Sequence, residues 1–231
     1  MEELSRTAML LGKEQVEMLK EKKVIIFGVG GVGGYTCEAL VRSGVGQIDI
    51  VDSDEVSLSN INRQIIALHS TVGQKKVEVM KNRISDINPQ AVVNAYDMFV
   101  TPDNLNQFNL STYDYVIDAI DTVSSKIAIA EICDREGIRV ISSMGAGNKL
   151  NPCGFKVADI YKTSVCPLAK AVRTALKKKG VKKLKVVYSE EEPVVKAHLE
   201  GDGKRVPASC AFVPSVAGLI IASEVIKDLI K

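Results

Sequence analysis

Long apolar runs and an N-terminal targeting signal are the first features that this sequence of 231 residues lacks. The best candidate for a membrane span, residues 213–221, falls well short of the roughly 20 residues that cross a bilayer, and it contains Pro214. The first 15 residues include early acidic side chains and no apolar segment ahead of a cleavage site. We therefore expect a cytoplasmic protein with neither a membrane span nor a signal peptide.

Closely spaced cysteines are also missing. The five cysteines are an odd number, and no two of them have the spacing of two to four residues that zinc ligands usually have. This pattern fits a reducing compartment and predicts that the protein holds no zinc. A nucleophilic thiol stays open, because Cys166 precedes a proline and Cys210 precedes an apolar helix, although a lone cysteine is more often a small buried apolar residue.

The sequence contains no internal repeat, no low-complexity linker and no shift in composition that would mark a domain boundary. Its 46% hydrophobic and 25% charged residues are typical of a globular protein that buries a core. We therefore expect a single domain over residues 1–231.

Acidic residues are absent from residues 160–189, which hold nine lysines and arginines. The whole chain has 30 basic and 28 acidic residues, so without this segment 21 basic residues stand against 28 acidic ones and the net charge is −7. A basic segment on an otherwise acidic protein indicates contact with a polyanion, and a solvated lysine-rich surface is the simpler alternative. The residues that we expect to contact a polyanion are Lys170, Arg173, Lys177, Lys178, Lys179, Lys182 and Lys183.

Short apolar runs alternate with helical patterns through residues 1–145. Strands are expected at residues 24–27, 48–51, 92–96, 115–119 and 139–142, and helices at residues 32–43, 72–88 and 124–136, with a helix-like turn at residues 101–108. This alternation predicts an α/β fold with a Rossmann-like, doubly wound, mostly parallel sheet and helices on both faces. The C-terminal extension is expected to contain strands at residues 155–157 and 185–188, a basic helix at 167–179, a surface loop at 190–207 and a last helix at 216–229.

Residues 28–33 read GVGGVG, directly after the first expected strand and before the first expected helix. Gly28, Gly30, Gly31 and Gly33 permit a tight turn and a close backbone approach, and the following helix N-terminus offers free N–H groups to a phosphate. Asp52 stands about 20 residues further on, where an acidic residue binds a ribose in dinucleotide-binding folds. The turn therefore predicts a nucleotide site, but it leaves NAD and ATP equally open.

Residues 52–64 read DSDEVSLSNINRQ and have no counterpart in the dehydrogenase pattern. Three further motifs are GQKKV at residues 73–77, DAIDT at residues 118–122, and Ser5-Arg6 near the N-terminus. Together they resemble the ThiF/MoeB/HesA family of ubiquitin-activating-type adenylating enzymes over nearly the whole chain. The resemblance implies that the chain transfers AMP from ATP to a carboxylate, and it makes an NAD-dependent oxidoreductase the weakest alternative.

The resemblance also implies roles for the residues in these motifs. Adenylation must hold three charged phosphates and stabilise the departing pyrophosphate, which suits arginine, lysine and a divalent metal. Arg63 and Lys76 would bind the phosphates, and Asp121 would hold Mg²⁺. Arg6 would reach the phosphates of the other subunit in a homodimer. The remaining residues expected to bind the nucleotide are Gly28, Gly30, Gly31, Gly33, Asp52, Asp54, Asn60, Asn62, Gln64 and Thr122.

Two features bear on which carboxylate is activated. Many family members that adenylate a ubiquitin-like sulfur carrier have zinc-binding cysteine pairs, which this chain lacks. Residues 101–108 (TPDNLNQF) and 159–179 (DIYKTSVCPLAKAVRTALKKK) resemble members that convert threonylcarbamoyladenosine at position 37 of tRNA to its cyclic form. These enzymes adenylate the threonyl carboxylate, and the carbamoyl group then closes the ring and expels AMP. The resemblance implies that residues 1–145 bind the nucleotide and that residues 146–231 face tRNA, whose phosphates the basic segment would neutralise.

Two residues depart from the family pattern. Thr122 replaces the usual asparagine, and Cys166 stands where this group commonly has aspartate. Two alternatives to tRNA dehydration remain. One is adenylation of a ubiquitin-like sulfur carrier, with a cysteine desulfurase or sulfur-acceptor system as a partner, and the other is a non-catalytic nucleotide-binding scaffold. A scaffold has no need of Arg63, Lys76 and Asp121 together, so dehydration of tRNA is the leading hypothesis.

Overall fold

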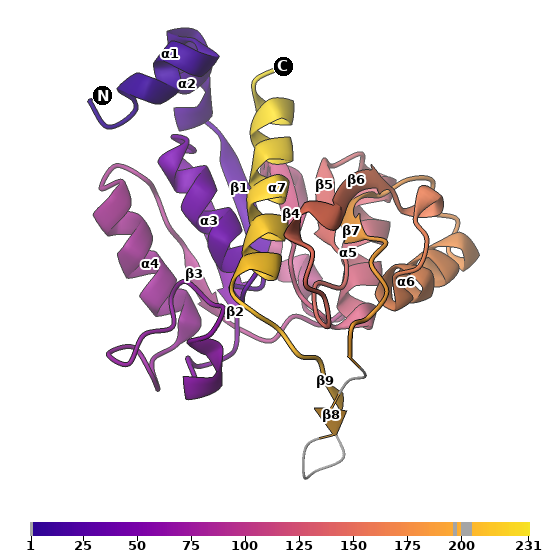
Figure 1. Cartoon of the computed structure of the whole chain (residues 1–231). Coiled ribbons are helices and arrows are strands. Elements are labelled where there is room, and N and C mark those ends of the chain that lie inside the picture. The colour runs from indigo at the N-terminus through magenta and orange to yellow at the C-terminus, as the bar shows by residue number, and fades with distance from the viewer. Residues whose placement is uncertain (1, 196–197, 200–204) are drawn as a thin grey trace.

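A seven-stranded sheet forms the centre of the computed structural model, which describes residues 2–195, 198–199 and 205–231 (Figure 1). The strand order is β3-β2-β1-β4-β5-β7-β6, and every neighbouring pair is parallel except β6 with β7. The strands are β1 (Lys23–Phe27), β2 (Gln47–Asp52), β3 (Ala95–Asp97), β4 (Tyr115–Asp118), β5 (Val140–Ser143), β6 (Phe155–Asp159) and β7 (Lys185–Ser189). The predicted Rossmann-like, mostly parallel sheet is confirmed.

Helices cover both faces of this sheet (Figure 1). One face carries α3 (Gly33–Arg42), α4 (Lys76–Ile87) and α7 (Phe212–Leu229), and the other carries α5 (Val123–Glu136) and α6 (Pro167–Lys178). In β1, Ile26 joins the core under α3, α4 and α7, whereas Ile25 and Phe27 join the core on the side of α5. Since both faces of the strand are buried, β1 reads as a continuous apolar run, which is why its position was predictable.

Two helices that the sequence patterns did not single out precede β1. They are α1 (Ser5–Leu11) and α2 (Lys13–Lys20), and both lie at the amino end of β1 (Figure 1). α2 buries Val16 and Leu19, whereas α1 buries none of its residues, and Met9 and Leu10 are 85% and 84% exposed. No helix in the described part of the chain is long and apolar enough to span a membrane.

Several expected boundaries differ from those in the structure. The helix expected at residues 72–88 begins only at Lys76, because Gly73 has φ +84° and Lys75 is extended. The strand expected at residues 92–96 is shifted to β3, since Val92 makes only an isolated bridge to Gln47. The last helix begins before residue 216, because Pro214 falls in its first turn, where a backbone N–H would have no partner within the helix.

The surface loop expected at residues 190–207 is partly regular. Within it, β8 (His198–Leu199) and β9 (Arg205–Val206) form a two-stranded antiparallel ladder beyond the carboxyl ends of the sheet (Figure 1). Residues 196–197 and 200–204 of the expected loop lie outside the described residues. Five short 3₁₀ helices complete the described chain: η1 (Leu58–Asn60), η2 (Leu105–Phe108), η3 (Leu110–Thr112), η4 (Pro152–Gly154) and η5 (Ile160–Lys162).

Candidate active site

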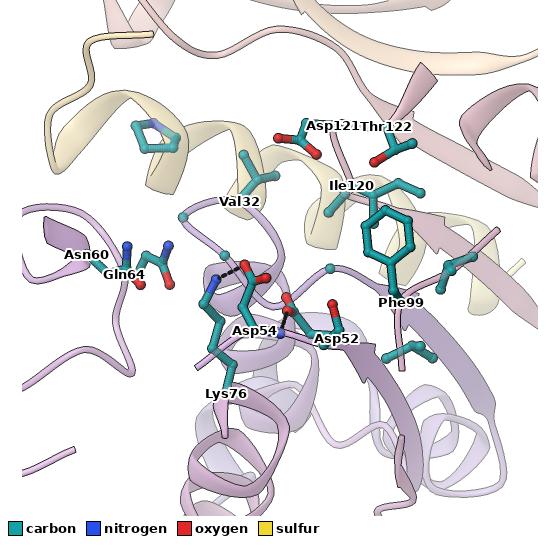
Figure 2. Close-up of a pocket in the computed structure, with 18 of the residues that line it drawn as sticks. Val32, Asp52, Asp54, Asn60, Gln64, Lys76, Phe99, Ile120, Asp121 and Thr122 are labelled. Carbon is teal, nitrogen blue, oxygen red and sulfur yellow. Dashed lines mark hydrogen bonds and ion pairs between the residues drawn. The ribbon is translucent and has the colours of Figure 1, made fainter. Parts of the chain in front are cut away.

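A cavity of about 360 Å³ opens at the carboxyl ends of β1, β2 and β4 (Figure 2). This is the crevice in which open α/β sheets bind their ligands. The predicted residues that line it are Gly28, Gly30, Gly31, Asp52, Asp54, Asn60, Arg63, Gln64, Lys76, Asp121 and Thr122. Gly33, Asn62 and Arg6 are not in its lining. The structure therefore gathers most of the predicted site from five separate segments of the sequence.

Three glycines of the turn differ in what a side chain at each position would contact. A Cβ on Gly28, which has φ +92°, would lie 2.8 Å from the carbonyl oxygen of Ala119, so this glycine lets β1 approach the end of β4. A Cβ on Gly33 would lie 1.8 Å from the carbonyl oxygen of Gly28, so only glycine closes the turn onto α3. A Cβ on Gly30 would meet only the Gln64 amide, at 3.8 Å. Gly30 is thus the position that keeps the cavity open to a close-lying ligand.

Asp52 joins the glycine turn to the end of β2. Its Oδ2 accepts a hydrogen bond from the Val29 amide at 2.7 Å. Its Oδ1 accepts one from the Asp54 amide at 2.9 Å (Figure 2). Each carboxylate oxygen accepts more than one hydrogen bond, so Asp52 can also receive the hydroxyls of a ribose. The carboxylate therefore shapes the cavity and offers an acceptor to its occupant.

Lys76 is a buried cation at the start of α4. Its Nζ lies 2.7 Å from Oδ2 of Asp54, and the two side chains are 6% and 66% exposed, respectively (Figure 2). The Lys76 amide also donates to the Asp54 carbonyl at 3.0 Å, which fixes the helix start against the segment after β2. A buried ammonium has little water to screen it, so this charge acts strongly on an anion in the cavity.

Arg63 is tied to the segment that leads into α7. Its Nη1 donates to the carbonyl of Ser59 and to Oδ1 of Asn62, both at 2.8 Å. Asn62 in turn donates from Nδ2 to the carbonyl of Ser209 at 3.0 Å. Asn62, predicted to bind the nucleotide, does not line the cavity and connects Arg63 to Ser209, far along the chain.

Gln64 presents an unpaired acceptor beside the glycine turn. Its Oε1 is buried and has no hydrogen-bond partner in the described chain, although almost all buried polar atoms in proteins have one. Asn60, next to it in Figure 2, is also buried, and its Oδ1 accepts from the Ser57 amide at 3.1 Å. The unpaired amide oxygen marks this end of the cavity as a place for a polar ligand.

Asp121 lies across the cavity from Asp54 and Lys76, on the segment between β4 and α5 (Figure 2). It is exposed, and no described residue donates a hydrogen bond to its carboxylate. Thr122 immediately precedes α5, so the unpaired N–H groups of that helix begin at the cavity edge. A free carboxylate beside a phosphate-binding turn has the hard oxygen ligands that Mg²⁺ prefers.

Comparison with known proteins identifies the architecture. The model of the ThiF family matches residues 4–231. The chain belongs to the ThiF family. A tRNA threonylcarbamoyladenosine dehydratase of Bacillus subtilis (strain 168) is 48% identical over 241 residues, which cover 99% of this chain and 95% of that protein.

A protein of the same name from Escherichia coli (strain K12) is 37% identical over 246 residues. The alignment covers 96% of this chain and 91% of that protein. The crystal structure of the E. coli tRNA N6-threonylcarbamoyladenosine dehydratase, TcdA, in complex with ATP superposes with a TM-score of 0.90 at 36% identity. That match covers 99% of this chain and 93% of the other. The predicted resemblance to the ThiF family and to its tRNA threonylcarbamoyladenosine dehydratases is confirmed.

This ThiF-family cavity has an apolar wall that the sequence analysis did not predict. Met98, Phe99, Val100 and Ile120 are among the lining residues, and Phe99 is 58% exposed. In Figure 2, Phe99 and Ile120 lie on the side of the cavity opposite Gln64. A flat aromatic side chain at a cavity edge can pack against a planar base. Their place in the chain was the available signal, because residues 98–100 come shortly after the strand expected at residues 92–96 and directly after β3, at the same edge of the sheet as the glycine turn.

Arg6 lies away from the cavity of its own chain. It is on α1, at the amino end of β1, whereas the cavity is at the carboxyl end of the same strand (Figure 1). The two cysteines considered as nucleophiles do not line the cavity either. Cys166 is buried, and Cys210 is half-buried beside the Ser209 carbonyl that binds Asn62. The geometry therefore brings no thiol into the cavity wall.

The basic residues lie along α6 and the turn after it. Lys179 pairs with Glu131 of α5 at 2.6 Å, and the Lys182 amide donates to Asp134 at 3.1 Å. Because a helix rises about 1.5 Å per residue, Asp134 lies roughly 18 Å along α5 from the cavity. Arg173 donates to the Thr163 carbonyl at 2.8 Å. The lysines of this predicted set are all exposed: Lys170, Lys177, Lys178, Lys179, Lys182 and Lys183.

Proposed function

We propose that this chain is an ATP-dependent tRNA threonylcarbamoyladenosine dehydratase. The observation that carries the proposal is the cavity itself: Arg63, Lys76 and Asp121 surround the glycine turn in a chain that is 48% identical to the B. subtilis dehydratase along almost its whole length. In the reaction, the threonyl carboxylate attacks the α-phosphorus of ATP and displaces pyrophosphate. The carbamoyl group then attacks the acyl carbon, loses a proton and expels AMP, so the nucleoside loses one water.

The residues of the cavity divide this work between them. The triphosphate of ATP would lie over Gly30, with Arg63 and Lys76 taking the negative charge that moves to the leaving pyrophosphate. Asp52 would accept hydrogen bonds from the ribose hydroxyls. Asp121 would hold Mg²⁺, which neutralises phosphate charge without a proton transfer. We propose that residues 1–145 and 146–231 form one catalytic domain, with the second half facing tRNA.

We propose further that the chain works as a homodimer in the cytoplasm. Arg6 is outside its own cavity, and α1 exposes Met9 and Leu10 almost completely. An apolar helix surface of this kind is suited to packing against another protein surface. A second copy of the chain that received α1 would obtain Arg6 beside its phosphates.

The direct test is incubation with ATP, Mg²⁺ and tRNA that carries threonylcarbamoyladenosine, followed by mass analysis of the nucleosides. We expect the modified nucleoside to lose one water only when ATP is present, with AMP and pyrophosphate formed in equal amounts. Pyrophosphate exchange that required a protein ending in Gly-Gly would instead support the sulfur-carrier alternative and its desulfurase partner. ATP binding without either reaction would support the scaffold.

Charge reversal on the basic segment tests the tRNA contact. The variant K177E/K178E/K182E/K183E should bind whole tRNA much more weakly, and its log affinity should fall less steeply with log salt, by about 0.7–0.9 for each lost phosphate contact. These lysines lie far from the reacting nucleoside, so turnover of a short anticodon-loop oligonucleotide should stay near the native value.

Lys81→Glu, a single reversal on α4 at the opposite face of the sheet, is the control and should leave tRNA affinity almost unchanged. Titrations of labelled tRNA at several salt concentrations give both the affinity and the slope. An unchanged slope for the fourfold variant would mean that these lysines are only a solvated surface.

A further inference from the structure

A buried ion pair lies directly behind the segment that carries Asp121. Lys126, in the first turn of α5, donates from Nζ to both carboxylate oxygens of Asp118 at 2.9 and 3.0 Å. The two side chains are 0% and 1% exposed. In the sequence analysis Asp118 appears only as the first residue of the DAIDT motif, and Lys126 is not singled out at all. The pair links the end of β4 to the start of α5 across the segment that lines the cavity.

The Asp118 carboxylate is fully occupied by protein donors. Besides Lys126, the Ser142 hydroxyl donates to Oδ2 at 2.6 Å, and the Ile120 amide donates to Oδ1 at 3.3 Å. Four hydrogen bonds account for the acceptor sites of a carboxylate. Asp118 does not line the cavity, so of the two aspartates in the DAIDT motif only Asp121 is available to a cation.

The segment between these aspartates is fixed on its other side by the glycine turn. The Ala119 amide donates to the Phe27 carbonyl at 2.8 Å, and the Ala119 carbonyl oxygen is so near Gly28 that a Cβ there would lie only 2.8 Å from it. Residues 119–122 are therefore held between the phosphate-binding turn and the Lys126–Asp118 pair. A shift of either anchor would move the Asp121 carboxylate relative to the turn.

A buried ion pair is a poor device for stability alone. Taking both charges out of water costs free energy, and an apolar pair of similar volume often stabilises a protein as well or better. The pair instead fixes the orientation of the Asp118 carboxylate. Lys126 binds both of its oxygens and Ser142 binds one of them, so the plane of the carboxylate cannot rotate freely. The same arrangement neutralises a negative charge close to the place where a triphosphate would lie.

We infer that Lys126, acting through Asp118 and Ser142, is a positioning residue for the metal-holding carboxylate Asp121. This inference rests on the proposed function, since it assigns the ion pair to the Mg²⁺–ATP complex that the cavity would hold. Because Lys126 binds Asp118, the Asp118 carboxylate is not available to the metal. The same contact holds residues 119–122 so that Asp121 faces the phosphates. Residues that hold a metal ligand in this way typically change metal affinity or activity about 10- to 100-fold when mutated.

The test replaces both charges at once, with K126M/D118N, so that no unpaired charge is left in the core. ATP binding is measured by calorimetry over a range of Mg²⁺ concentrations, which needs no turnover. We expect the Mg²⁺ concentration for half-maximal enhancement to rise about tenfold, with ATP affinity in the absence of Mg²⁺ little changed. Hydrogen exchange at the Ile120 amide should become faster, because its acceptor is no longer held.

Two further variants keep this test decisive. Ser142→Ala removes one hydrogen bond to Asp118 and leaves the ion pair, so it should give the same changes to a smaller extent, and it carries the test if the double variant does not fold. Lys185→Met removes a half-buried lysine that pairs with Asp228 at the far end of the sheet, so it should lower stability without moving the Mg²⁺ dependence.

Native Mg²⁺ dependence and native exchange at Ile120 in the variants that fold would overturn the inference and leave the pair a purely structural contact. Failure of the proposed function is a separate outcome. It would appear as a native protein that binds Mg²⁺–ATP but does not dehydrate the tRNA nucleoside, and the calorimetric comparison of variants would still decide the role of Lys126.

Discussion

Replacing Asp121 with alanine is expected to lower the rate of the adenylation step about a thousandfold, the loss that follows removal of a group acting on transition-state charge. Asp121 lines the cavity with a free carboxylate, so without it the Mg²⁺ that would offset charge on pyrophosphate would lose its proposed protein ligand. ATP affinity measured without Mg²⁺ should change only slightly, because removing a negative charge does not weaken the attraction of a polyanion. Single-turnover release of pyrophosphate and calorimetric binding of ATP measure the two quantities.

Asp103→Ala is the matched control, because Asp103 is an exposed carboxylate that does not line the cavity, and this variant should keep the native rate.

The Asp121→Ala protein also serves to test the proposed dimer. If Arg6 acts on the partner's phosphates, mixing inactive Arg6→Ala and Asp121→Ala proteins should restore roughly a quarter of the native sites, because each mixed dimer has one complete site. No restored activity after confirmed subunit exchange would place Arg6 outside the reaction.

Two alanine substitutions in the glycine turn should separate folding from binding. In Gly33→Ala the new Cβ would lie 1.8 Å from the Gly28 carbonyl oxygen, a backbone atom that cannot move aside. We expect a loss of several kcal/mol of stability and of all measurable ATP binding. In Gly30→Ala the new Cβ would meet only the Gln64 amide at 3.8 Å, so the fold should remain intact.

Gly30→Ala should nevertheless bind ATP at least about tenfold more weakly, because its methyl group would project toward the place where the backbone must approach a phosphate. Thermal unfolding and calorimetric ATP binding on both variants give the comparison. A Gly30→Ala protein with native ATP affinity would show that the triphosphate does not lie over this part of the turn.

The sheet and most of the cavity were predictable because their signals are local. A continuous apolar run locates β1, Ile48, Ile50 and Val51 locate β2, and the glycines between β1 and α3 can serve few other purposes. The other predicted site residues stand in motifs at the ends of elements: Asp52 ends β2, Lys76 begins α4, and Asp121 follows β4. Parallel strands bring such positions to one edge, so sequence order was enough to assemble them.

The contacts that were missed depend on how the elements pack, even where the residues are close in the sequence. The pattern shows Lys126 as an ordinary helix residue, and only the packing of β4 against α5 shows that it pairs with Asp118. The contact of Asn62 with the Ser209 carbonyl likewise depends on where the segment before α7 lies. Phe99 was overlooked because an isolated phenylalanine after a strand is usually core. Each of these roles depends on tertiary packing, which neither propensity nor periodicity encodes.

The ion pair between Lys76 and Asp54 gives the cavity a counter-charge of its own. An incoming anion must displace a carboxylate that sits 2.7 Å from the ammonium, so a small anion such as inorganic phosphate gains little by the exchange. A triphosphate that also reached Arg63 and the glycine turn, as proposed, would gain more. When AMP and pyrophosphate leave, the exposed Asp54 side chain can pair with Lys76 again, so the buried ammonium always has an anion beside it. We therefore expect product release to be an exchange of anions, which keeps a strongly charged cavity from trapping its own pyrophosphate.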